Sequence, residues 1–270
     1  MHTNAREGAP IENGAFNMHS ISLLFRVSTF AFAVAAAATL LAAPRQAQAQ
    51  IIAGGSALTE GNSSTFPVIG QSGSVTQIFF PTSALSTLAI GNNITGLAFR
   101  LDGARTTGTP ALSFVDYRIF LGQALDNSLE PTFADNYSNA NPRTLVRSGA
   151  LNIAAGAFAA GPGAGPEPFG PTITFDSAYS YQGGGLIIEI IHTPNGTGQN
   201  FFVDATTSGG SQALTNTPAT ALGGTSISAP ITRLAIGPAT VPEVGTGALL
   251  ALAALPVIGA CIARRKGARA

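Results

Sequence analysis

Hydrophobic and polar residues alternate with a period of two in short stretches of the middle of the chain. The clearest case is Ser113–Leu121, where one face would hold Val115, Tyr117, Ile119 and Leu121, and the other Asp116, Arg118 and Phe120. Such alternation is typical of an antiparallel strand with one buried face. The most apolar stretch is Leu186–His192, and it predicts a central strand.

Other apolar or β-branched runs predict further strands, separated by Gly, Asn and Pro turn residues. They are Thr76–Phe80, Ile94–Leu101, Thr144–Ile153 with a bulge at Ser148-Gly149, Thr172–Phe175, Phe201–Asp204 and Ile231–Ile236. Three segments are predicted as loops: 156–171, 213–230 and the polar segment 126–141, which could also hold a short helix. The pattern predicts an all-β domain over residues 50–237, an antiparallel β-sandwich of the jelly-roll type.

The N-terminal segment has the pattern of a secretory signal peptide. Arg26 precedes an uncharged run from Val27 to Ala43, and the small residues Ala47 and Ala49 stand before Gln50. Small residues at these two positions mark a cleavage site, so residues 1–49 are predicted to be a signal helix that is removed before Gln50. An uncleaved membrane helix is the alternative. Met18 is a candidate for the true start.

Residues 238–270 predict a membrane anchor. The stretch from Val244 to Ala263 has twenty residues without a charge, and as a helix it would span about 30 Å, the thickness of a bilayer core. A basic cluster follows it: Arg264, Arg265, Lys266 and Arg269. Positive charge stays on the cytoplasmic side, so the domain would lie outside. A buried core helix is the alternative reading of 244–263.

Val241, Pro242 and Glu243 stand directly before this apolar stretch. The order of a Pro-Glu pair, an apolar helix and a basic end resembles the PEP-CTERM sorting signal of Gram-negative bacteria. The third position of the motif is Val244 here, where the family has Pro. The resemblance implies that an exosortase, a membrane processing enzyme, is the partner of residues 238–270. It also implies delivery to the cell surface or the extracellular matrix of a biofilm.

Charge and cysteine content exclude several classes of function. Only 10% of residues are charged, against about 25% in ordinary soluble domains. Between Gln50 and Thr240 there are six Arg, no Lys, six Asp and four Glu, so the net charge is 6 − 10 = −4. A nucleic-acid partner would require a basic surface and is not expected. The single cysteine, Cys261, lies in the apolar stretch, so no disulfide can form within the chain.

Few residues offer catalytic chemistry. His192 is the only histidine between Gln50 and Thr240, and we expect it at a surface or strand edge. Glu189 is the only acid inside an apolar strand, and a glycosidase would need a second carboxylate about 5–10 Å away. The alternation places Ile188 and Ile190 on the face opposite Glu189, which predicts a solvent-facing carboxylate. No catalytic residue, no metal site and no cofactor is therefore assigned.

Calcium remains an option, because carboxylate oxygens are its usual ligands. The candidates are Asp102, Asp116, Asp126, Asp135 and Asp204, although no D-x-D-x-D-G loop is present. The predicted function is that of an exported, non-enzymatic surface or matrix protein with a structural or adhesive role. A carbohydrate-binding module is the alternative, with Tyr117, Tyr137, Tyr179 and Tyr181 as stacking candidates for an extracellular polysaccharide. An exported glycoside hydrolase is the least favoured reading.

Overall fold

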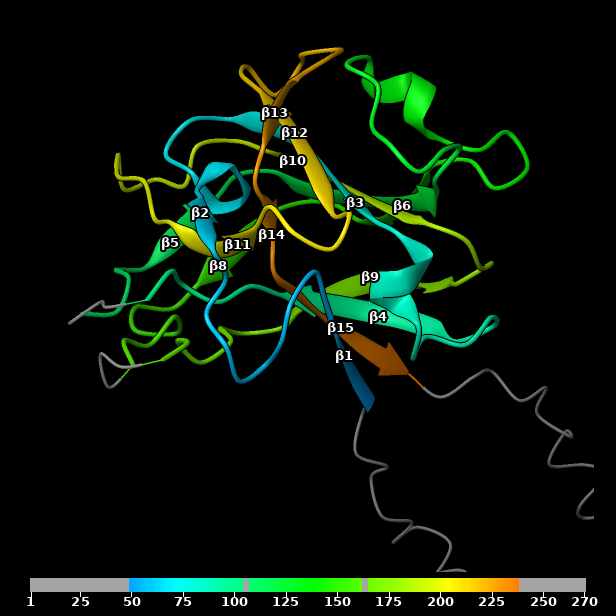
Figure 1. Ribbon diagram of the computed structural model, residues 1–270. Helices are drawn as coiled ribbons and strands as arrows, with labels where there is room; N and C mark the ends of the chain where they lie inside the picture. Colours follow the sequence, from blue (N-terminus) through cyan, green and yellow to red (C-terminus); the bar gives the residue numbers. More distant parts are fainter. Residues whose placement is uncertain (1–48, 104–106, 162–164, 238–270) are drawn as a thin grey trace, which may run out of the picture. The chain divides into compact units, whose positions relative to one another are not determined.

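The computed structural model describes residues 49–103, 107–161 and 165–237 (Figure 1). In these ranges the regular elements are strands, apart from three short 3-10 helices, η1 (Pro67–Ile69), η2 (Thr82–Leu85) and η3 (Phe133–Asn136). No helix among the described residues is long and apolar enough to cross a membrane. The all-β prediction is confirmed. The predicted signal helix and the predicted membrane helix at 244–263 lie outside the described residues.

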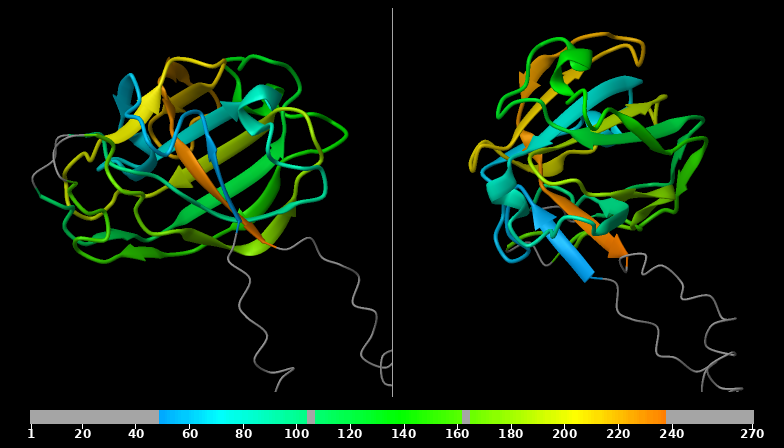
Figure 2. Two further views of the ribbon diagram at one scale, coloured as in Figure 1. Left: turned by 60° about the horizontal axis from the view of Figure 1, so that its bottom comes forward. Right: turned by 90° about the vertical axis from the view of Figure 1, so that its right-hand side faces the viewer.

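Two large antiparallel sheets form the framework. The four-stranded sheet has the order β1 (Ala49–Ala53), β15 (Thr232–Gly237), β4 (Asn93–Ala98), β9 (Ile173–Ser180). The six-stranded sheet has the order β13 (Thr225–Ile227), β12 (Gln212–Asn216), β3 (Ser74–Phe80), β10 (Leu186–His192), β6 (Tyr117–Gln123), β7 (Thr144–Arg147). Figure 2 shows these strands from two further sides.

Two small antiparallel sheets complete the described fold. One has the order β14 (Ala229–Pro230), β11 (Val203–Thr206), β2 (Ser63–Thr65), and the other pairs β5 (Leu112–Phe114) with β8 (Leu151–Ile153). One hydrophobic cluster joins the two large sheets. It includes Ile94, Leu97 and Leu234 from the four-stranded sheet, and Ile78, Ile119 and Ile188 from the six-stranded sheet. Burial of these inward side chains is the main stabilising contribution to such a fold.

The predicted central strand is confirmed. β10 lies between β3 and β6, and Ile188 is opposite both Ile78 and Leu121. All seven of its residues are buried. A strand covered on both faces reads as a continuous apolar run rather than an alternating one, which explains the composition of this stretch.

The predicted strand Ser113–Leu121 is two strands. Tyr117, Ile119 and Leu121 face the core as expected, but the chain breaks at Val115 and Asp116, between β5 and β6. Val115 is 80% exposed, so its predicted inward position was wrong. The break is held by Thr193, whose backbone N–H donates to the Asp116 carbonyl.

The segment Thr144–Ile153 is also two strands instead of one bulged strand. β7 pairs with β6, whereas β8 pairs with β5 in a different sheet. The chain turns between them at Gly149, whose φ of 85° lies in the left-handed region that favours glycine. Its carbonyl accepts hydrogen bonds from the backbone of Tyr117 and from the Arg147 guanidinium, which fix the turn.

The predicted loop 213–230 contains most of β12 together with β13 and β14, so this prediction was wrong. Its Thr and Ser residues form strands because β12 extends the six-stranded sheet beside β3. The Thr76 and Thr215 hydroxyls bond to each other across this pair at 3.0 Å. The predicted loop at 156–171 and the short helical turn within 126–141 are confirmed for the described residues.

Candidate functional site: a hydroxyl-lined cleft

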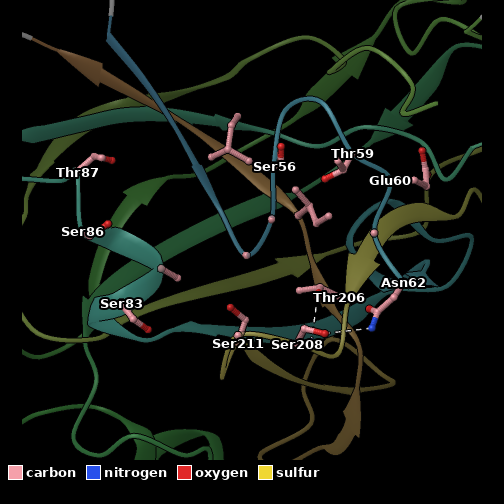
Figure 3. Close-up of a pocket in the computed structure, with 17 residues that line it drawn as sticks. Ser56, Thr59, Glu60, Asn62, Ser83, Ser86, Thr87, Thr206, Ser208 and Ser211 are labelled. Atoms are coloured by element: carbon pink, nitrogen blue, oxygen red, sulfur yellow. Dashed lines mark hydrogen bonds between the residues drawn. The ribbon is translucent and has the colours of Figure 1, made fainter.

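A cleft of about 680 Å³ lies beside the end of β1. Four segments that are distant in sequence form its walls (Figure 3). They are the loop 54–62 after β1, the η2 region 83–87, the end of β11 with the turn 208–211, and Ile231. Its volume lies within the range of about 300–1,000 Å³ that is usual for small-ligand sites.

Neutral polar groups dominate the lining of this cleft. They are Ser56, Thr59, Asn62, Ser83, Ser86, Thr87, Thr206, Ser208 and Ser211. Ile52, Ala84 and Ile231 add aliphatic surface, and Glu60 is the one charged residue among the described residues of the lining. The cleft therefore presents hydrogen-bonding groups and aliphatic patches, with neither a cationic nor an aromatic side chain.

Two glycines allow the loop 54–62 to lie close to the core. A Cβ on Gly54 would meet the Phe80 ring at 2.9 Å, and Gly54 has a φ of 80°. A Cβ on Gly55 would meet Ile231 Cδ1 at 2.7 Å. A larger residue at either position would require the loop or the side chain of Phe80 or Ile231 to shift.

The buried side chain of Arg100 holds the backbone of the loop 54–62. The Arg100 and Asp204 side chains are fully buried and form an ion pair at 2.5 Å. The guanidinium also donates to the carbonyl oxygens of Ser56, Ala57 and Thr59, at 3.0, 3.3 and 2.6 Å. A buried charge is tolerated when it is paired and hydrogen-bonded in this way. The ion pair thus fixes the backbone of one wall of the cleft.

The structure brings together two of the five predicted calcium candidates. One oxygen each of Asp102, Asp204 and Glu60 lies within 4.8 Å of the others. Both Asp204 oxygens already accept hydrogen bonds, from Gly61 N–H at 2.9 Å and from Arg100 at 2.7 Å. The Arg100 guanidinium therefore supplies the positive charge that a cation would bring, and we assign no metal here.

The other three calcium candidates lie elsewhere. Asp116 forms an exposed ion pair with Arg118 at 2.9 Å, and Asp126 and Asp135 are exposed. Glu60 was not among the candidates. Partial burial raises the pKa of its carboxyl group, and the neighbouring Asp204 carboxylate acts in the same direction. The Gly103 N–H, which donates to Glu60 at 2.8 Å, opposes this shift.

Glu189 is buried, with 1% of its surface exposed, so its predicted solvent-facing position was wrong. It does lie on the face opposite Ile188 and Ile190, but the segment around η3 covers that face. Its carboxylate accepts hydrogen bonds from Gln77 at 2.7 Å and Tyr137 at 3.1 Å. It also forms an ion pair with Arg143 at 3.0 Å. These contacts attach the covering segment to the sheet.

His192 is buried as well, at 1% exposed, in contrast to the surface position predicted from its place at the end of a strand. β10 is central, so even its last residue is covered. The ring stacks on Tyr117 at 5.6 Å between centroids. Its nitrogens lie 3.0 Å from the Ser74 hydroxyl and 2.6 Å from the Thr193 carbonyl oxygen. Burial lowers the pKa of His192, and its contacts with backbone carbonyls oppose this.

The four tyrosines do not form a stacking surface for sugars. Tyr117, Tyr137, Tyr179 and Tyr181 are 0%, 8%, 7% and 3% exposed. Burial raises the pKa of each phenol, to about 12 for Tyr179. Two of the phenols donate to backbone carbonyls, those of Val68 and Gly184. Their prediction as exposed aromatics was wrong, because a tyrosine on an alternating strand faces the core as readily as solvent.

The predicted cleavage and sorting residues are only partly within the described chain. Ala49 and Gln50 begin β1 and are exposed. Ala47, the motif Val241, Pro242 and Glu243, and the basic residues from Arg264 to Arg269 lie outside the described residues. The sequence matches no protein-family model and no curated protein.

Proposed function

We propose that the chain is an exported, non-enzymatic protein of the cell surface or extracellular matrix, sorted through its PEP-CTERM-like segment. The observation that carries this proposal is the antiparallel pairing of β1 and β15, the first and last strands of the described residues, which stand next to the predicted sorting segments in the sequence. β1 begins at Ala49, next to the predicted cleavage before Gln50. β15 ends at Gly237, shortly before Val241. Removal of both segments would leave every strand of the described residues in place, apart from Ala49.

The arrangement of β1 and β15 also supports export by this route. The two strands are antiparallel neighbours, and Ala49 lies opposite Ile236 (Figure 1). The chain therefore enters and leaves the domain at adjacent points. The predicted N-terminal cleavage, between Ala49 and Gln50, falls at the exposed first residues of β1.

We further infer that the two large sheets form a jelly-roll-like sandwich. The chain crosses repeatedly between them, with β3, β6, β7 and β10 in one and β4, β9 and β15 in the other. Connections that cross between two antiparallel sheets occur in Greek-key sandwiches, jelly rolls among them. This architecture is common in domains that bind or assemble outside cells, where it provides a rigid frame.

The engagement of the buried titratable groups supports a non-enzymatic role. Glu189 attaches a surface segment, Asp204 pairs with Arg100, and His192 is packed against Tyr117. Each of these three side chains contacts other residues that hold the described fold together. A catalytic acid or nucleophile would instead need access to substrate.

The sorting part of the proposal is tested by replacing the Pro-Glu pair in the full chain in its native host. We expect the double variant Pro242→Ala, Glu243→Ala to stay in the membrane fraction and to react with an antibody raised against residues 264–270. The wild type should lose this epitope. The proposal fails if wild type and variant are processed alike.

The chain supplies a matched control. A second Pro-Glu pair, Pro166-Glu167, lies in the loop between β8 and β9, and Glu167 is buried there. Pro166→Ala changes the same dipeptide in a folded setting. It should be sorted like the wild type, because recognition needs the pair directly before an apolar stretch.

A further inference from the structure

We propose that the hydroxyl-lined cleft binds a short segment of a neutral polysaccharide. The proposal rests on the proposed function, since a surface or matrix protein with an adhesive role meets polysaccharide outside the cell. It places the binding site away from the four tyrosines, which are buried. The site is the cleft between the loop 54–62, the η2 region and the turn 208–211 (Figure 3).

The lining fits a ligand that is polar and uncharged. Hydroxyl and amide groups can donate to and accept from sugar hydroxyls, and the aliphatic patch of Ile52, Ala84 and Ile231 can contact the C–H face of a sugar ring. Glu60 is a carboxylate at one end of this lining and would repel uronic acid or phosphate groups. No lysine or arginine lines the cleft among the described residues to offset that repulsion.

Ser211 provides an independent indication that the cleft has a ligand. It is 6% exposed, and its Oγ is buried without a hydrogen-bond partner among the described residues. In Figure 3 the Ser211 hydroxyl points into the cleft, toward the other side chains that line it. An unpaired buried hydroxyl carries a desolvation cost, which a bound sugar hydroxyl would remove.

The walls are held in place before a ligand binds. Arg100 fixes the backbone at Ser56, Ala57 and Thr59. Asn62 connects this loop to the opposite wall, because its Nδ2 donates to Thr207 Oγ1 at 3.0 Å and Ser208 Oγ at 3.1 Å. A preformed site loses little side-chain and loop freedom on binding.

The remaining wall is accessible from solvent. Ser83, Ser86 and Thr87 are exposed and line the cleft along η2 and the turn that follows it. A polysaccharide could therefore lie along this side without its ends being enclosed. An open groove of this kind suits a chain segment better than a free monosaccharide.

The test uses the full chain in a zwitterionic detergent that has no sugar headgroup. Cellotetraose, maltotetraose, laminaritetraose and tetragalacturonate are titrated separately and followed by calorimetry. We expect at least one of the three neutral tetrasaccharides to bind with a Kd below about 1 mM, and tetragalacturonate to bind at least about tenfold more weakly. The proposal is overturned if none of the neutral probes binds at about 10 mM, or if tetragalacturonate binds as well as they do.

Three variants test whether the tetrasaccharide binds in the hydroxyl-lined cleft. Ser83→Trp should obstruct the cleft and abolish binding, whereas Ser128→Trp places the same side chain at an exposed serine that does not line the cleft and should bind like the wild type. Ser211→Ala should weaken binding about 3- to 10-fold, the effect of one lost hydrogen bond. Its Tm should be unchanged or higher, because an unpaired buried hydroxyl is removed. Binding that survives Ser83→Trp, or a lower Tm for Ser211→Ala with unchanged affinity, would contradict the assignment.

Failure of this proposal can be distinguished from failure of the proposed function. Export and sorting are measured from the location and mass of the protein, which do not depend on sugar binding. A processed surface protein that binds none of the tetrasaccharides would retain the proposed function and lose the assigned ligand.

Discussion

Arg100 and Asp204 are the residues on which the cleft most depends. Each is fully buried, and each would be left as an unpaired charge if the other were removed. Arg118 and Asp116 form the same kind of pair at the surface, where the side chains are 40% and 39% exposed. A comparison of the two ion pairs therefore separates the effect of burial on stability from the effect of charge pairing.

We expect Arg100→Met to lower the free energy of unfolding by about 3–5 kcal/mol, because it leaves Asp204 buried and unpaired. Arg118→Met should cost less than about 1 kcal/mol, since solvent screens the exposed pair. Urea unfolding of the two variants measures both values. Equal losses for the two variants would show that the loop 54–62 does not depend on the buried pair.

His192 gives the fold a dependence on pH. Burial lowers its pKa below the value in the unfolded chain, so the folded state favours the neutral ring. Its stabilising contribution is therefore present above about pH 6.5, the unfolded pKa, and is lost as the pH falls through the lower folded pKa.

We expect the stability of the wild type to fall between pH 7 and pH 5 more steeply than that of His192→Gln. Glutamine does not titrate, so the difference between the two curves reports the histidine. Thermal unfolding at several pH values measures it. Parallel curves would mean that His192 is protonated equally in the folded and unfolded chain.

At the scale of elements, Glu189 is one of the groups that attach the segment around η3 to the six-stranded sheet. Tyr137, Gln77 and Arg143 all meet this carboxylate, and Arg143 also lies over the Phe120 ring at 3.7 Å. The backbone of the segment adds its own bonds, including Leu125 N–H to the Asn136 carbonyl at 2.9 Å.

We expect Glu189→Gln to loosen this segment locally. The substitution keeps the shape but removes the charge, and the loss of about 1 kcal/mol corresponds to roughly fivefold faster amide exchange in residues 125–143. Exchange in β4 and β15 should not change, which serves as the internal control. Uniform acceleration across both sheets would contradict a local role. If the wild type hydrolyses a glycoside and Glu189→Gln does not, the glycoside hydrolase alternative would be favoured instead.

Strands were predictable where side-chain alternation or a long apolar run determines them, as at Ile119 and Leu186. Their breaks were not, because they depend on partners distant in sequence: Asp116 is held by Thr193, and Arg147 caps the turn at Gly149. The cleft was missed for the same reason. Its serines and threonines come from three separate segments and form no motif.

At the scale of the whole molecule, the described strands form an all-β domain that lies in the sequence between two predicted sorting segments. β1 and β15 lie side by side, so processing at either end would leave both large sheets intact apart from Ala49. The described residues form a polar cleft of about 680 Å³, whose loop 54–62 is held by Arg100. These features together support a displayed binding or matrix protein.

The most direct test of this account is the intact mass of the protein recovered from the envelope and medium of its native host. We expect a species that begins at Gln50 and ends close to Glu243. A species that retains residues 1–49 or the basic residues Arg264–Ala270 would contradict it, because the chain would then be held in the membrane by a segment that the account requires to be removed.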